Sequence, residues 1–123
     1  KIIYQLHDKR IRVSLFIEPT LSAVKQAKIL KSDCIELHTG KYCSSLKKKN
    51  KEIEYKKLKR ASIYGNKLGL EVHAGHGLTY NIAFKVSKID HISELNIGHF
   101  IISESIFIGL KNSIKKFKKM INK

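Results

Sequence analysis

The stretch Glu71–Tyr80, EVHAGHGLTY, decides the fold, because a short apolar strand ends there in a turn of glycine and histidine. The segment Leu70–Ala74 has the length and apolar content of a buried strand, and Tyr80–Val86 follows it as a short helix. The two glycines allow a tight turn and a close approach of the backbone to a ligand. The stretch therefore predicts one strand followed by one helix.

The same order recurs along the rest of the chain. Apolar runs predict three more strands, at Arg12–Pro19, which should be buried, and at Cys34–Gly40 and Ile92–Ile97. Apolar residues at three- and four-residue steps predict helices from Thr20 or Ser22 to Ser32, from about Glu52 to Leu68, and over Ile102–Ile121. No linker rich in Pro, Gly or Ser separates these units, so residues 1–123 are expected to form a single domain.

Four strand–helix units predict an α/β fold with a parallel sheet, either doubly wound or closed as a barrel. Four units make half of a (β/α)₈ TIM barrel, and the chain begins with Lys1 rather than Met. These features suggest the C-terminal half-barrel of a longer chain.

Composition limits the possible functions. The 123 residues have a mean hydropathy of −0.24, and no apolar run approaches the roughly 18 to 20 residues that cross a bilayer. No secretory signal opens the chain, so a cytoplasmic location and no membrane partner are expected. Cys34 and Cys43 have neither metal-ligand spacing nor the density of a disulfide framework, which predicts reduced thiols and no metal site.

The charge is strongly basic. The chain has 25 Lys and Arg against 10 Asp and Glu, a net charge of +15, which can attract nucleic acid. Arginine, the better residue for bidentate phosphate and base recognition, occurs only at Arg10, Arg12 and Arg60. The lysines of Lys47–Lys59 and Lys111–Lys123 lie opposite apolar stripes, as on solvated helix faces. No nucleic-acid partner is expected, and a basic nucleic-acid-binding module is kept as an alternative.

Polar residues concentrate at the carboxyl ends of the four expected strands, FIEP, ELHTG, HAGHG and NIGH, which share one edge of a parallel sheet. Glu36 and His38 are two apart on one strand and should face the same way. A carboxylate placed there is desolvated unless it is paired, and such groups serve as acids, bases or charge stabilisers. A lysine-paired or surface glutamate explains the pattern equally well.

Two of these strand ends carry glycine and histidine directly before a helix. His73 and His76 bracket Gly75, and Asn96–His99, NIGH, repeats the pattern before the last helix. Backbone amides at a helix start can hold phosphate, and His76 can transfer a proton near neutral pH. The alternative is a turn histidine that only hydrogen-bonds the backbone. The coincidence of two such loops predicts a two-loop phosphate site.

Four motifs, RVSLFIEP, IELHTGKY, AGHGLTY and ELNIGHFII, resemble in order and spacing the carboxyl-terminal half of the pyridoxine 5′-phosphate synthase family, over about Lys1 to Met120. The resemblance implies a (β/α)₈ barrel, assembled as a homo-octamer, of vitamin B6 biosynthesis. Such enzymes condense 3-amino-2-oxopropyl phosphate with 1-deoxy-D-xylulose 5-phosphate to pyridoxine 5′-phosphate, phosphate and water. The implied partners are small phosphorylated substrates, with no metal or organic cofactor.

The resemblance also implies roles for individual residues. His76 matches the proton donor of the family, and Glu36 matches the carboxylate that stabilises the transition state. Gly77, Gly98 and His99 match residues that bind the substrate phosphate. Amine–ketone condensation, dehydration and ring closure all require proton transfers, which suits acid–base residues.

Two positions depart from the family pattern. His73 stands where the family typically has Asn, and Glu104 stands where an Arg commonly follows NIGH. Loss of that cation would remove an ion pair or weaken a positive field near phosphate. The amino-terminal half of the family supplies another general-base histidine and a catalytic glutamate, so this half alone is expected to be inactive. A non-catalytic remnant of the barrel is the second alternative.

Overall fold

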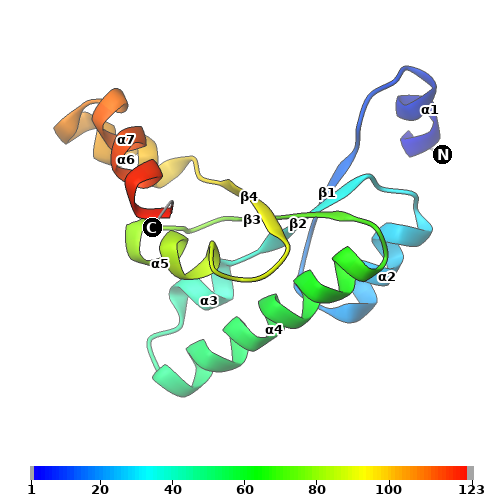
Figure 1. Cartoon of the computed structure of the whole chain (residues 1–123), viewed down its shortest axis with the longest axis horizontal. Helices are drawn as coiled ribbons and strands as arrows, with labels where there is room; N and C mark the ends of the chain where they lie inside the picture. The colour runs from blue at the N-terminus through cyan, green and yellow to red at the C-terminus, as the bar shows by residue number, and fades with distance from the viewer. Residues whose placement is uncertain (1, 122–123) are drawn as a thin grey trace.

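A computed structural model describes residues 2–121 of the chain and shows one parallel sheet of four strands (Figure 1). The strands are β1 (Ser14–Ile17), β2 (Cys34–His38), β3 (Glu71–Gly75) and β4 (Ile92–Asn96). Their order in the sheet is their order in the chain, and every neighbouring pair is parallel. The α/β class and the four strands predicted from the sequence are confirmed.

Seven helices lie within the described residues. They are α1 (Ile2–Asp8), α2 (Leu21–Ile29), α3 (Gly40–Ser44), α4 (Lys48–Lys67), α5 (Tyr80–Val86), α6 (His99–Ile108) and α7 (Leu110–Ile121). The sequence did not predict α1 or α3, which are short and have no long apolar period.

The helices that connect the strands lie on one side of the sheet (Figure 1). On that side Ile35 and Leu37 of β2 are fully buried, as is Ala74 of β3. A doubly wound sheet has helices on both faces, whereas strands in sequential order with right-handed crossovers place all of them on one face, as in a barrel. Of the two predicted arrangements, the sheet has the barrel-type order.

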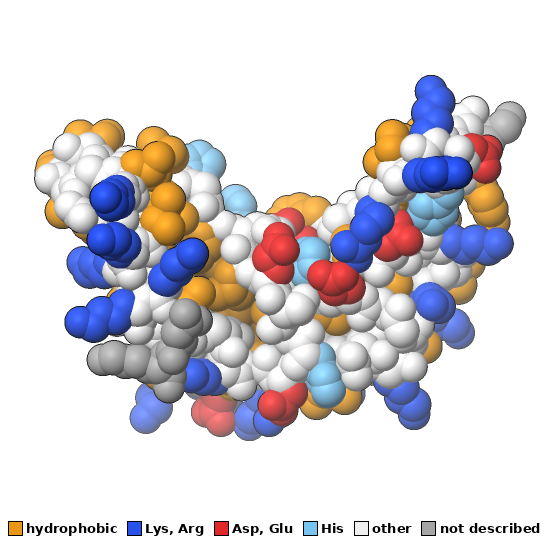
Figure 2. Space-filling model, turned by 45° about the horizontal axis from the view of Figure 1, so that its top comes forward, with side chains coloured by type: hydrophobic (Ala, Val, Ile, Leu, Met, Phe, Trp, Pro, Cys, Tyr) orange, Lys and Arg blue, Asp and Glu red, His pale blue; other side chains and the backbone are white. Residues whose placement is uncertain are grey.

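The opposite side, which we call the open face, carries alternate residues of the same strands. Glu36, His38 and His73 lie there, and Glu94 of β4 is exposed. The prediction that Arg12–Pro19 forms a buried strand is wrong in this respect, because β1 is an edge strand and Phe16, on its open face, is 55% exposed. Figure 2 shows the open face hollowed between α6–α7 and α1, with acidic and histidine side chains in the hollow.

Helix α4 packs closely against the covered face. Leu58 and Ala61 are buried there, and Gly65 lies directly on the sheet. A Cβ atom at Gly65 would lie 2.9 Å from Val72 Cγ2 and 3.0 Å from Ile35 Cδ1. The glycine therefore lets the helix approach β2 and β3 more closely than a larger residue would.

The single last helix predicted over Ile102–Ile121 is wrong, because Gly109 divides it. Gly109 has φ +79° and ψ 147°, a conformation open essentially to glycine alone, and the chain turns there so that α6 and α7 pack on each other. The apolar stripe is divided as well. Phe117 is buried, but Ile102 and Ile106 are 61% and 79% exposed.

Other predictions from composition hold for the described residues. Most lysines of α4 and α7 are exposed, as expected for solvated faces. Cys34 and Cys43 are both free thiols. Between residues 2 and 121 the structure contains no helix with the length and apolar character of a membrane span.

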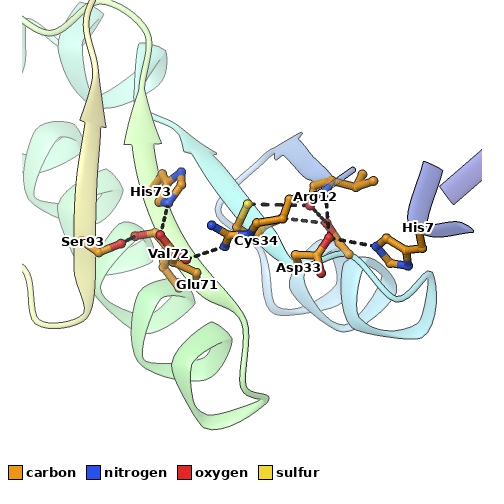
Figure 3. Close-up of polar contacts among 10 residues, drawn as sticks. His7, Arg12, Asp33, Cys34, Glu71, Val72, His73 and Ser93 are labelled. Carbon is orange, nitrogen blue, oxygen red and sulfur yellow. Dashed lines mark hydrogen bonds and ion pairs between the residues drawn. The ribbon is translucent and has the colours of Figure 1, made fainter. Parts of the chain in front are cut away.

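A carboxylate fastens the start of β1 to the start of β2 (Figure 3). Asp33 Oδ2 accepts a hydrogen bond of 2.7 Å from Val13 N and lies 2.9 Å from His7 Nε2 of α1. The backbone N–H of Val13, and secondly His7, hold the pKa of Asp33 below its usual value. The same side chain thus anchors α1 and the first strand.

Asp33→Asn should lower the urea midpoint of unfolding at neutral pH, and its effect should diminish as the pH falls below the ordinary carboxyl range. The folded-state pKa of Asp33 lies below its ordinary value of 3.8, so its stabilising contribution is present above that pH and disappears as pH falls through the folded pKa. Asp90→Asn is the matched control, because Asp90 is exposed and lies 4.0 Å from Lys59 Nζ. Equal losses for both variants at neutral pH would contradict the assignment.

Candidate functional site

A cavity of about 590 Å³ opens at the carboxyl edge of the sheet. The five residues predicted as site residues, Glu36, His76, Gly77, Gly98 and His99, all line it. Its other lining residues are Phe16, Leu78, Asn96, Ile97, Phe100 and Ser103. Residues from all four strands, or from the turns that directly follow them, thus meet in one place, as expected for parallel strands whose carboxyl ends share an edge.

Glu36 reaches across the sheet to the far strand. Asn96 Nδ2 of β4 donates a 2.6 Å hydrogen bond to Glu36 Oε2 of β2. The side chain passes over Gly75 of β3, where a Cβ atom would lie 2.0 Å from Glu36 Oε1. The possibility of a lysine-paired glutamate is therefore wrong, because the partner of Glu36 is the neutral amide of Asn96.

His76 directly follows β3 in an uncommon conformation. Its φ is +79° and that of Gly77 is +77°, so two successive residues are left-handed. A non-glycine residue at such a φ is strained and is held by its surroundings. Thr39 Oγ1, which is fully buried, contributes by donating to the carbonyl oxygens of Gly75 at 2.8 Å and His76 at 2.5 Å. The imidazole is exposed and lines the cavity.

The start of α6 also faces the cavity. Gly98 is the N-cap of α6, and within the described part of the chain no side chain caps this helix. A Cβ atom at Gly98 would have nothing within 4 Å, so there is space beside the backbone. Uncapped N–H groups at a helix start favour an anion, and this geometry suits the predicted phosphate site.

The two departures from the family pattern lie outside the cavity. His73 is 8% exposed and its Nε2 lies 2.8 Å from Glu71 Oε1, while Arg12 bonds the other oxygen of Glu71 at 2.5 Å (Figure 3). His73 and then Arg12 lower the pKa of Glu71. Glu104 of α6 lies 3.9 Å from Lys116 Nζ of α7. Both residues have ionic partners of their own.

Sequence reasoning missed three contributors to the site. Asn96 was noticed only as part of NIGH, Thr39 only as part of ELHTG, and Phe16 was assigned to a buried strand. The position of Asn96 and Thr39 at strand ends indicates a site. Nothing in the sequence indicates Phe16, because its exposure depends on which face of β1 it occupies. Within residues 2–121, no group of three or more His, Cys, Asp or Glu side chains is arranged to hold a metal ion.

Gly75→Ala should break the hydrogen bond between Asn96 and Glu36, because the new methyl group occupies the path of the carboxylate. The side-chain amide signal of Asn96 in a ¹H–¹⁵N spectrum should shift and exchange faster with solvent. Ser93→Ala, which removes a hydroxyl from the neighbouring part of β4, should leave this signal in place. An unchanged Asn96 amide in the Gly75→Ala variant would show that the carboxylate does not pass over Gly75.

Comparison with known proteins identifies relatives along the whole chain. The family model described as pyridoxal phosphate biosynthesis protein PdxJ matches residues 1–123. A pyridoxine 5′-phosphate synthase of Pelagibacter ubique is 54% identical over 99% of this chain and 52% of its own length. The proteins of that name from a Wolbachia of Drosophila simulans and from Rhodospirillum rubrum are 46% and 44% identical, each over 95% of this chain and 49% and 47% of their own lengths.

The chain thus spans about half the length of the curated relatives that it matches. A family model that covers every residue, together with relatives of one name at 44% to 54% identity, gives a single assignment. The chain belongs to the PdxJ family of pyridoxal phosphate biosynthesis proteins.

Proposed function

We propose that this chain supplies the carboxyl-terminal half of a cytoplasmic pyridoxine 5′-phosphate synthase. The reaction is condensation of 3-amino-2-oxopropyl phosphate with 1-deoxy-D-xylulose 5-phosphate, without a metal or organic cofactor. The observation that carries the proposal is the cavity at the carboxyl edge, because it gathers all five residues to which the family resemblance gives a role. Family membership supports the same reaction.

The arrangement suits the chemistry step by step. Backbone N–H groups of Gly77, Gly98 and His99 would hold the phosphate of the amino ketone near the start of α6. The carboxylate of Glu36, fixed by Asn96, would stabilise the positive charge of imine intermediates. His76, exposed to the cavity, would donate a proton to the oxygen that leaves as water.

The fold proposed for the complete enzyme is a closed (β/α)₈ TIM barrel whose interior is the open face. β1 and β4 are the edges of the sheet, and large apolar side chains are exposed on α1, which precedes β1 in the chain, and on α6, which follows β4. Ile106 and Phe107 of α6 are 79% and 84% exposed, and Ile2 of α1 is 72% exposed. A second set of four strand–helix units would pair with both edges and cover these side chains. Assembly of such barrels into a homo-octamer is proposed from the family resemblance alone.

The two alternatives are less well supported by the geometry. The non-catalytic remnant was suggested by His73 and Glu104, but both lie outside the cavity, where His73 is hydrogen-bonded to Glu71 and Glu104 is paired with Lys116. The nucleic-acid module was suggested by the net charge of +15, but the hollow of the open face gathers acidic and histidine side chains (Figure 2). Neither alternative explains why the five site residues share one cavity.

Joining residues 1–123 to the amino-terminal half of the Pelagibacter relative should give an enzyme that forms pyridoxine 5′-phosphate from the two substrates. His76→Asn in this chimera should reduce kcat by about 10²- to 10⁴-fold, because a general acid is removed. His91→Asn is the matched control, since His91 is exposed, lies outside the cavity and has a φ of +69° that Asn tolerates.

The chimera tests two claims separately. A folded chimera with no product in the presence of both substrates would contradict the proposed function of this half. Full activity after His76→Asn would leave the reaction standing and contradict the role of His76.

A further inference from the structure

Three aromatic rings from three strand ends meet beside the cavity. The rings of His38 and His76 have centroids 4.7 Å apart, and Phe16 packs edge-on against His38 at 4.9 Å. Phe16 also lies 6.4 Å from the ring of His76. The imidazole of His76 thus has a second imidazole as its neighbour on the side of β2.

Gly40, the first residue of α3, makes room for this pair. A Cβ atom there would lie 2.9 Å from His38 Nε2 and 3.1 Å from His76 Cδ2. Both rings therefore rest against the same glycine, and the Nε2 edge of His38 faces the side on which His76 lies.

The other edge of His38 is held by a carboxylate. His38 Nδ1 lies 3.2 Å from Glu18 Oε1, and Lys41 Nζ donates a 2.7 Å hydrogen bond to Glu18 Oε2. Lys41 and, more weakly, His38 lower the pKa of Glu18, so this carboxylate is charged at neutral pH. Because a carboxylate only accepts hydrogen bonds, Nδ1 of His38 carries a proton, and the second proton of the imidazolium would reside on Nε2.

We propose that His38, oriented by Glu18, is a positioning residue for His76 that controls when His76 carries the proton it donates. A charged His38 disfavours a second charge on the neighbouring ring, because like charges at this separation repel. The two imidazoles therefore titrate as a coupled pair. The inference rests on the proposed function only in naming His76 as the proton donor.

The other titratable groups near the pair or lining the same cavity are Glu18 after β1, Glu36 on β2, Lys41 and Cys43 on α3, and His99 on α6. The carboxylate of Glu36 is bonded to Asn96, and burial raises the pKa of Cys43, which keeps this thiol neutral near neutral pH. Among the described residues, His38 is the only titratable ring that packs against His76, at an interplanar angle of 48°.

The test is an NMR titration of the histidine Cε1–H signals of the chain over about pH 5 to 9. His38→Gln removes the neighbouring charge, so the apparent pKa of His76 should rise by about 0.5 to 1 pH unit and its curve should become that of a single site. Glu18→Gln should lower the apparent pKa of His38 and move the His76 curve upward to a smaller extent. His91→Asn, at an exposed histidine distant in sequence from the cluster, should leave the His76 curve unchanged.

An unchanged His76 curve in both the His38→Gln and Glu18→Gln variants would overturn the proposal. Glu18 is exposed, so Glu18→Gln should leave the fold intact. It therefore tests the coupling through the His76 titration curve even if His38→Gln disturbs the fold. The titration requires no turnover. A failed chimera therefore counts against the proposed function, and an unchanged titration counts against the coupling of His38 with His76.

Discussion

The connection of neighbouring parallel strands by crossovers of one hand determines the rest of this structure, because it places every connecting helix on the same face of the sheet. The covered face then takes the apolar residues, such as Ile35 and Leu37, and packs against α2 and α4. The alternate residues of the same strands remain on the open face. The polar side chains of β2, β3 and β4 gather there and are free to serve a ligand.

Glycines, which have no side chain, determine the geometry of the site as much as the polar residues do. Gly75 lets Glu36 cross β3 to reach Asn96, and Gly40 lets the rings of His38 and His76 meet. Each arrangement uses the space that the methyl group of an alanine would occupy, so it depends on the close packing of the folded chain. Thr39, held in the core, keeps the left-handed turn at His76 in place and so presents the imidazole in a fixed position.

Strand positions could be predicted from the sequence because apolar runs mark strands. The five cavity residues could be predicted because polar residues collect where parallel strands end and because their motifs resemble those of the family. The hydrogen bond of Glu36 to Asn96 could not, because it depends on the register of three strands that are distant in sequence. The exposure of Phe16 depends on which face of β1 it occupies. The division of the last helix at Gly109 could not be predicted, because the apolar period continues through this residue. Only the backbone conformation of Gly109 shows the turn.

The proposed barrel requires a second half that pairs with the sheet edges β1 and β4 and covers the open face. Hydrogen exchange can be compared between the isolated chain and the chain joined to the amino-terminal half of the Pelagibacter relative. Backbone amides of β1 and β4 should gain protection on joining, while those of β2 and β3, already paired on both sides, should change little. Unchanged exchange at β1 and β4 in a folded fusion would rule out this closure of the barrel.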